Sequence, residues 1–154
     1  MDIKSGQGYP AGTLSNFTPH PFIIDGISCA SMEGFLQSLK FKDVEMQKFV
    51  CTLSGRIAKA RGAKKNWKRT QTLYWKGKEI KRDSEEYQVL LDRAFEALAT
   101  NESFKKALLA TQSATLTHSV GRTKISETVL TVSEFCGRLM RLRTHLQHKD
   151  LYDE

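Results

Sequence analysis

Three side chains of different chemistry stand close together in residues 31–41, at spacings that would align them on a helix. Glu33, Gln37 and Lys40 occupy positions i, i+4 and i+7, which fall on one side of an α-helix. In such a line the carboxylate can exchange a proton, the amide can hydrogen-bond a hydroxyl, and the ammonium can bind a phosphate. The alternative interpretation is a solvated helix face with an ordinary Glu/Lys arrangement.

The neighbouring residues predict the helix that would carry this line. Ser31 is a suitable N-cap. This cap would place Glu33 in the first turn, close to unpaired backbone N–H groups and the positive end of the helix dipole. A second stripe at 3.6-residue spacing is apolar and is expected to be buried, and it consists of Met32, Phe35, Leu36 and Leu39.

Upstream of this helix, residues 12–30 predict a loop followed by a tight hairpin. Two prolines bracket His20, and Asp25-Gly26 joins two short apolar runs. The Asp-Gly pair is a strong signal for a two-residue hairpin turn. A loop, a hairpin and a capped helix in succession commonly line a pocket.

The order of these motifs resembles the NADAR family (named for NAD and ADP-ribose), also called YbiA-like. The matching motifs are Leu-Ser-Asn-Phe at 14–17, Pro-Phe at 21–22, Asp-Gly at 25–26, Ser-Met-Glu at 31–33 and Gln-x-x-Lys-Phe at 37–41. The likeness continues at Trp67, at Phe104–Thr111 and at Leu116–Ser119. One departure follows, because many members have an aspartate, an aromatic residue and Trp-Gly where this chain has residues 124–130. We align Glu127 with that aspartate, and the usual stacking surface is missing.

This resemblance implies an N-glycosidase, a hydrolase that acts on N-glycosyl bonds. Members are associated with two reactions that break a ribose C1′–N bond. One removes ADP-ribose from modified guanine, in DNA or in a nucleotide. The other releases ribose 5-phosphate from a phosphoribosyl-aminopyrimidine of riboflavin biosynthesis. The implied partner is an ADP-ribosyl or phosphoribosyl N-glycoside, with DNA as a further partner if it carries the modified guanine. A non-catalytic module that binds ADP-ribose or nucleic acid is the alternative.

The resemblance also suggests which residues form the site. The candidate catalytic residues are Glu33, Lys40, Glu127 and His118, in which Glu33 orients water or stabilises the ribosyl cation and His118 is a second proton carrier. The candidate substrate-binding residues are Asn16, Phe17, Gln37, Trp67, Trp75 and Arg82. The alternatives are a structural histidine, tryptophans that anchor a basic loop to the core, and a solvated arginine.

The charge of the chain favours a polyanionic substrate. There are 24 Lys and Arg residues against 17 Asp and Glu, for a formal net charge of +7. The excess is concentrated in residues 56–82, where Glu79 is the one acidic residue and where Trp67 and Trp75 interrupt the cations. Cations interleaved with aromatic rings can bind phosphates and stack a base. This pattern favours ADP-ribosylated guanine over a compact phosphoriboside.

Composition and missing motifs exclude other classes of protein. The length of 154 residues and the 40% hydrophobic content fit one NADAR-like domain over 1–148 with a frayed acidic tail over 149–154. No apolar run approaches the ~20 residues of a membrane span, and no signal peptide begins the chain. We therefore expect a cytoplasmic protein with no membrane partner. The chain has no nucleotide-binding glycine motif and no HExxH, and its three cysteines are widely spaced, so we expect neither cofactor nor metal.

The predicted fold class is α+β with helix dominant and a small β component, in a single compact domain. Periodicity indicates at least four helices and four to six short strands, without the strand–helix alternation of a doubly wound sheet. Asp43 and Asn101 are expected to cap helices, and Asp83 with Glu86 has capping-box spacing. The last helix is predicted to begin around Ser133. It is expected to leave Arg138, Arg141, Arg143 and His145 in solvent.

Overall fold

Two short β-hairpins and six α-helices follow one another along residues 1–152, the part of the chain that the computed structural model describes. The first half contains β1 (Phe22–Ile24), β2 (Ile27–Cys29), α1 (Met32–Ser38), α2 (Val44–Cys51), α3 (Gly55–Ala63) and the short 3-10 helix η1 (Trp67–Arg69). The second half contains β3 (Thr72–Trp75), β4 (Lys78–Lys81), α4 (Glu85–Leu98), α5 (Glu102–Ala110) and α6 (Val132–Tyr152). The predicted helix-dominant α+β class is confirmed.

Both hairpins turn through two residues in the left-handed region. Ile24 pairs with Ile27 in β1–β2, and the turn residues Asp25 and Gly26 have φ of 50° and 77°. A two-residue hairpin turn whose twist matches that of the flanking strands requires positive φ at both of its central residues. The hairpin predicted from Asp-Gly is therefore confirmed. The second hairpin, β3–β4, uses positive φ at the two residues after Trp75 in the same way.

Side-chain caps fix where the helices begin. The Ser31 hydroxyl accepts a hydrogen bond from the backbone N–H of Gly34 at 3.0 Å, as predicted. The predicted caps Asp43 and Asn101 are confirmed as well. The capping box predicted at Asp83 and Glu86 is wrong. The N-cap of α4 is Ser84, which has an extended backbone and whose hydroxyl accepts a hydrogen bond of 3.2 Å from the backbone N–H of Tyr87. A side-chain oxygen of the N-cap residue thus accepts from the backbone at the start of α1, α2, α4 and α5.

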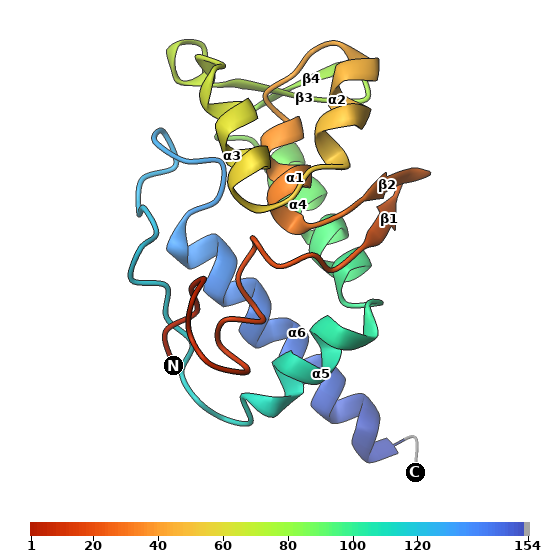
Figure 1. Cartoon of the computed structure of the whole chain (residues 1–154), viewed down its shortest axis with the longest axis vertical. Helices are drawn as coiled ribbons and strands as arrows, with labels where there is room; N and C mark the ends of the chain where they lie inside the picture. The colour runs from red at the N-terminus through yellow and green to blue at the C-terminus, as the bar shows by residue number, and fades with distance from the viewer. Residues whose placement is uncertain (153–154) are drawn as a thin grey trace.

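The helices form two groups joined by α4 and α6. In Figure 1, α1, α2 and α3 gather with the β3–β4 hairpin at one end of the molecule, whereas α5 lies at the other end and packs on α6. The N-terminal segment and residues 111–131 run along the same side of α6. These two segments are joined by a parallel bridge between Asp2 and Thr117.

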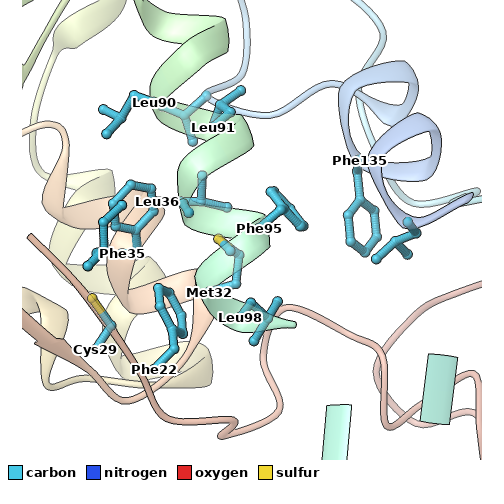
Figure 2. Packing of buried hydrophobic residues seen from close by; sticks show 14 of the residues in the cluster. Phe22, Cys29, Met32, Phe35, Leu36, Leu90, Leu91, Phe95, Leu98 and Phe135 are labelled. Atoms are coloured by element: carbon cyan, nitrogen blue, oxygen red, sulfur yellow. The ribbon is translucent and has the colours of Figure 1, made fainter. Parts of the chain in front are cut away.

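The core lies where α1, α4 and α6 meet. Figure 2 shows Met32, Phe35 and Leu36 of α1 facing α4, while Phe135 of α6 approaches Phe95, with the two ring centroids 6.2 Å apart. All five side chains are almost completely buried. The apolar stripe predicted for residues 32–39 is therefore the stripe that packs into the core, which leaves the other side of α1 for polar residues.

The C-terminal helix begins one residue before its predicted start and continues through Tyr152. The predicted acidic tail, 149–154, therefore begins within this helix, and its residues 153–154 lie outside the described part of the chain. Across residues 1–152, no helix combines the length and apolar character needed to cross a bilayer.

Candidate active site

A pocket of about 870 Å³ opens between α1, the segment from α3 to η1, the loop at 15–17 and the loop at 118–130. It brings together eight of the ten residues predicted for the site. These are Asn16, Phe17, Glu33, Gln37, Lys40, Trp67, His118 and Glu127. Trp75 and Arg82 do not line it.

Glu33 is the buried carboxyl group of this pocket. Its side chain is 9% exposed, and its Oε1 accepts a hydrogen bond of 2.8 Å from Nε2 of Gln37, one turn further along α1. Burial raises the pKa of Glu33, and the Gln37 hydrogen bond and the charges of Lys59, Lys40 and His118 oppose this rise to a smaller extent. A buried carboxyl group whose pKa is raised holds its proton more strongly than an ordinary glutamate, which is a common property of catalytic acids and bases.

Lys40 reaches the pocket from just beyond the end of α1. The helix ends at Ser38, earlier than the predicted stretch to residue 41, because its last turn tightens into i+3 bonds such as Lys40 N–H to Gln37 O at 3.2 Å. Burial lowers the pKa of Lys40, with Glu33 raising it and Lys68 and Lys59 lowering it further. The line of carboxylate, amide and ammonium predicted from the sequence therefore faces one pocket.

The loop at 15–17 is fixed to the start of α1. The backbone carbonyl of Asn16 accepts a hydrogen bond of 3.1 Å from the backbone N–H of Glu33, which satisfies a donor that the helix itself leaves free. The half-buried ring of Phe17 follows in the pocket wall, with Nζ of Lys59 6.0 Å from the ring centroid. An aromatic face next to a cation is thus accessible beside the carboxyl group.

One ring nitrogen of His118 is hydrogen-bonded to the backbone. Its Nδ1 lies 2.6 Å from the backbone oxygen of Ile3, and a carbonyl can only accept, so the neutral ring carries its proton on Nδ1 and leaves Nε2 as an acceptor. The ring also packs edge-on against Phe135, with centroids 5.1 Å apart. The contacts fix the tautomer and orientation of a side chain that lines the pocket. The residue is therefore structurally anchored in the pocket wall.

Glu127 is the exposed carboxylate of the pocket rim. It lies in the loop at 118–130, with its Oε2 3.9 Å from Nη1 of Arg122 in a solvent-exposed pair. Its surroundings differ from the dry surroundings of Glu33. The two candidate carboxylates are therefore not equivalent, because Glu33 is buried and Glu127 is exposed.

Most of the charged residues that line the pocket are cations. The pocket-lining cations outnumber the two carboxylates, Glu33 and Glu127, and they are Lys4, Lys40, Lys59, Lys64, Lys65, Lys68 and Arg122. Four of these lysines lie on α3 or on the segment that follows it through η1, and they are Lys59, Lys64, Lys65 and Lys68. None of the four forms an ion pair within residues 1–152. Unpaired ammonium groups around a concave site attract phosphates.

Trp67 and Trp75 have different places in the structure. Trp67 lines the pocket at one edge, although only 6% of the residue is exposed. Trp75 packs edge-on against Phe35, with ring centroids 5.2 Å apart, and its Nε1 donates to Oδ2 of Asp25 at 2.7 Å. The anchoring alternative thus describes Trp75, which ties the two hairpins together.

Arg82 is an interior residue, neither a pocket ligand nor a solvated side chain. It is 0% exposed, and its guanidinium donates to both carboxylate oxygens of Glu134, at 3.1 and 2.5 Å, and to the Thr128 carbonyl at 2.8 Å. Thr131 and Glu134 form a capping box at the start of α6, which sequence reasoning overlooked although the Thr-x-x-Glu spacing is visible. Arg82 therefore holds the end of the pocket loop against α6.

No group of three or more His, Cys, Asp or Glu residues in the described part of the chain is arranged to hold a metal ion. The three cysteines, Cys29, Cys51 and Cys136, are free and buried.

Comparison with known proteins gives three findings. The family model described as bacteriophage protein GP30.3 matches residues 8–144. An uncharacterised 17.1 kDa protein from the Gp30-rIII intergenic region of Enterobacteria phage T4 is 40% identical over 152 residues, covering 95% of this chain and 98% of that protein. The NMR structure of the E. coli protein YbiA is similar with a TM-score of 0.62 and 21% identity, covering 99% of this chain and 87% of that chain. The predicted YbiA-like fold is thereby confirmed.

Proposed function

The chain belongs to the family of bacteriophage protein GP30.3 and has a YbiA-like fold, and we propose that it is an N-glycosidase that hydrolyses a ribose C1′–N bond. The substrate that we propose is ADP-ribosylated guanine, in DNA or in a nucleotide. The observation that supports this proposal most is the buried carboxyl group of Glu33 in a pocket whose lining includes four lysines that form no ion pair within residues 1–152.

The reaction needs few groups, because the bond breaks with the development of positive charge on the ribose. As the C1′–N bond breaks, its electron pair leaves with the base nitrogen, and a water oxygen forms the new bond to C1′. The ionised carboxylate of Glu33 takes a proton from that water or stabilises the ribosyl cation. The departing base receives one proton, so water is divided between the two products. His118 Nε2 is a second group suited to carry that proton.

The remaining pocket residues bind the substrate in this proposal. Gln37 would hydrogen-bond a ribose hydroxyl, and Lys40 would balance the charge of Glu33 or pair with a phosphate. The lysines of α3 and η1 line the pocket and would bind the pyrophosphate. A pocket of about 870 Å³ lies in the upper part of the range of roughly 300–1,000 Å³ that is usual for ligand sites, which leaves room for a substrate larger than a compact phosphoriboside.

The choice of substrate can be tested by comparing the two N-glycosides. We expect kcat/KM to be higher for ADP-ribosylated guanosine than for the phosphoribosyl-aminopyrimidine. Binding of a DNA oligonucleotide that carries the adduct should weaken steeply with added salt, because phosphate contacts are screened. A preference for the aminopyrimidine together with flat salt dependence would assign the pocket to the riboflavin intermediate. Binding of the adduct without any product would indicate the non-catalytic module.

Phe17 gives a test of base stacking. Replacing Phe17 by alanine should weaken substrate binding by about 1–3 kcal/mol, the usual contribution of a stacked base, with little change in stability because the ring is only half-buried. Phe49→Ala is the matched control, since that ring is 48% exposed, also lies under a cation (Arg61, 5.2 Å) and is outside the pocket. Titration calorimetry on both variants measures the effect. Equal affinities for Phe17→Ala and the unmodified protein would remove Phe17 from the binding site.

A further inference from the structure

Gly62 in α3 lies unusually close to the side chain of Gln37 in α1. A Cβ atom added to Gly62 would stand 1.7 Å from Oε1, 2.7 Å from Cδ and 3.1 Å from Cβ of Gln37. Distances below 3.0 Å are essentially never found for real Cβ atoms. The amide of Gln37 therefore occupies the space that any other residue at position 62 would need.

The amide that fills this space is buried and only half hydrogen-bonded. Gln37 is 7% exposed, and its Nε2 donates to Glu33 at 2.8 Å. Its Oε1 has no hydrogen-bond partner within the described residues. Turning the amide over would direct a carbonyl oxygen at an ionised carboxylate, so the observed orientation is the one that suits ionised Glu33. The donor toward Glu33 is thus kept although the amide oxygen is unsatisfied.

We infer that Gly62 is a positioning residue for Glu33, which acts by leaving room for the Gln37 amide to donate to the carboxylate. This inference deepens the proposed function, because it concerns the same carboxylate, but it can be tested without any substrate. Replacing a glycine by alanine usually stabilises a helix. At a helical glycine whose small size is needed for packing, we expect the same replacement to destabilise the protein.

The charged groups around Glu33 allow the effect to be isolated. They come from three elements that face it: Lys40 follows α1, Lys59 lies on α3, and His118 lies on the loop at 118–130. A substitution at Gly62 changes none of these charges. Its effect on Glu33 should therefore arise through Gln37, whose hydrogen bond favours the ionised form.

The test is a carboxyl ¹³C NMR titration of Glu33, with the resonance assigned from its loss in Glu33→Gln. We expect Gly62→Ala and Gln37→Met each to raise the pKa of Glu33, because each removes the same donor. The double variant should match Gln37→Met alone, since Gly62 acts through Gln37. The matched control is Gly137→Ala on α6, where a Cβ meets only Nη1 of Arg141 at 3.4 Å. That control should leave the pKa of Glu33 unchanged.

An unchanged pKa in folded Gly62→Ala, or a shift that adds fully to that of Gln37→Met, would overturn the inference. If Gly62→Ala does not fold, Gln37→Ala/Gly62→Ala should fold, because the side chain that causes the clash has been shortened. Failure of that double variant would also overturn it. Absence of glycosidase activity in the unmodified protein, with the expected pKa changes present in the variants, would contradict the proposed function and leave the positioning role intact.

Discussion

Replacing Glu33 by glutamine is expected to lower turnover by roughly two to four decades, the usual contribution of a positioned acid–base group. Glutamine has the same shape, so the fold and ligand binding should survive. Glu127→Gln is the matched control, because Glu127 lines the same pocket but lies exposed at its rim, and we expect a much smaller loss there. Single-turnover kinetics with affinity measured separately give the comparison. An unchanged rate in Glu33→Gln would show that Glu33 takes no part in the reaction and that the role of α1 is structural.

The same variant should change how stability depends on pH. Burial raises the pKa of Glu33 above that of an ordinary glutamate, against the smaller effect of the Gln37 hydrogen bond. The contribution of Glu33 to stability is therefore fully present below its unfolded-state pKa and is lost as the pH rises through the folded-state pKa. Glu33→Gln removes this loss, so at neutral pH the variant should be more stable than the unmodified protein. Urea unfolding at several pH values measures the difference, and a less stable variant at neutral pH would contradict the burial argument.

Removing the Arg82 guanidinium is expected to destabilise the fold by about 3–5 kcal/mol, the usual cost of leaving a buried charge without its partner. In Arg82→Met, the carboxylate of Glu134 would keep its place in the capping box of α6 but lose both guanidinium hydrogen bonds. The carbonyl of Thr128 would lose its donor as well. Since Thr128 lines the pocket, ligand binding should weaken along with stability.

Arg93→Met is the matched control for Arg82. Arg93 also pairs with a carboxylate, Asp25, at 2.6 Å, but its side chain is 44% exposed. Exposed pairs contribute about 0–1 kcal/mol, so urea unfolding should separate the two variants clearly. Equal losses from both would show that burial does not distinguish the two ion pairs.

The local part of the site could be predicted from the sequence because its information lies within one helix. Ser31 caps α1, the apolar stripe packs into the core, and Glu33, Gln37 and Lys40 face one pocket. Each of these features depends on spacing along ten residues. The Asp-Gly hairpin is local in the same sense.

The residues whose surroundings were predicted wrongly contact partners that are far away in the chain. Arg82 pairs with Glu134, 52 residues further on, and no periodicity near Arg82 indicates that partner. Arg138 and Arg143 were expected in solvent but are 6% and 7% exposed. Arg138 donates to Gln88, and Arg143 donates to the Thr111 hydroxyl and the Ala114 carbonyl. Charged side chains on a helix face are usually solvated, so only the tertiary contacts reveal the exceptions.

Two features of the pocket also needed the folded chain. The proton on His118 is placed by the carbonyl of Ile3, 115 residues away, through the pairing of the N-terminal segment with residues 115–119. No pattern in the sequence indicates a role for Gly62. Its contact with Gln37 exists only because α3 packs on α1.

The most direct test of the proposed activity is product analysis. Purified protein is incubated with ADP-ribosylated guanosine, and the mixture is analysed by liquid chromatography and mass spectrometry beside Glu33→Gln and a sample without protein. We predict stoichiometric release of ADP-ribose and unmodified guanosine by the unmodified protein, with release slowed by two to four decades in Glu33→Gln. Intact substrate after prolonged incubation, or equal release by the protein and its Glu33→Gln variant, would contradict the assignment of this pocket as an N-glycosidase site that depends on Glu33.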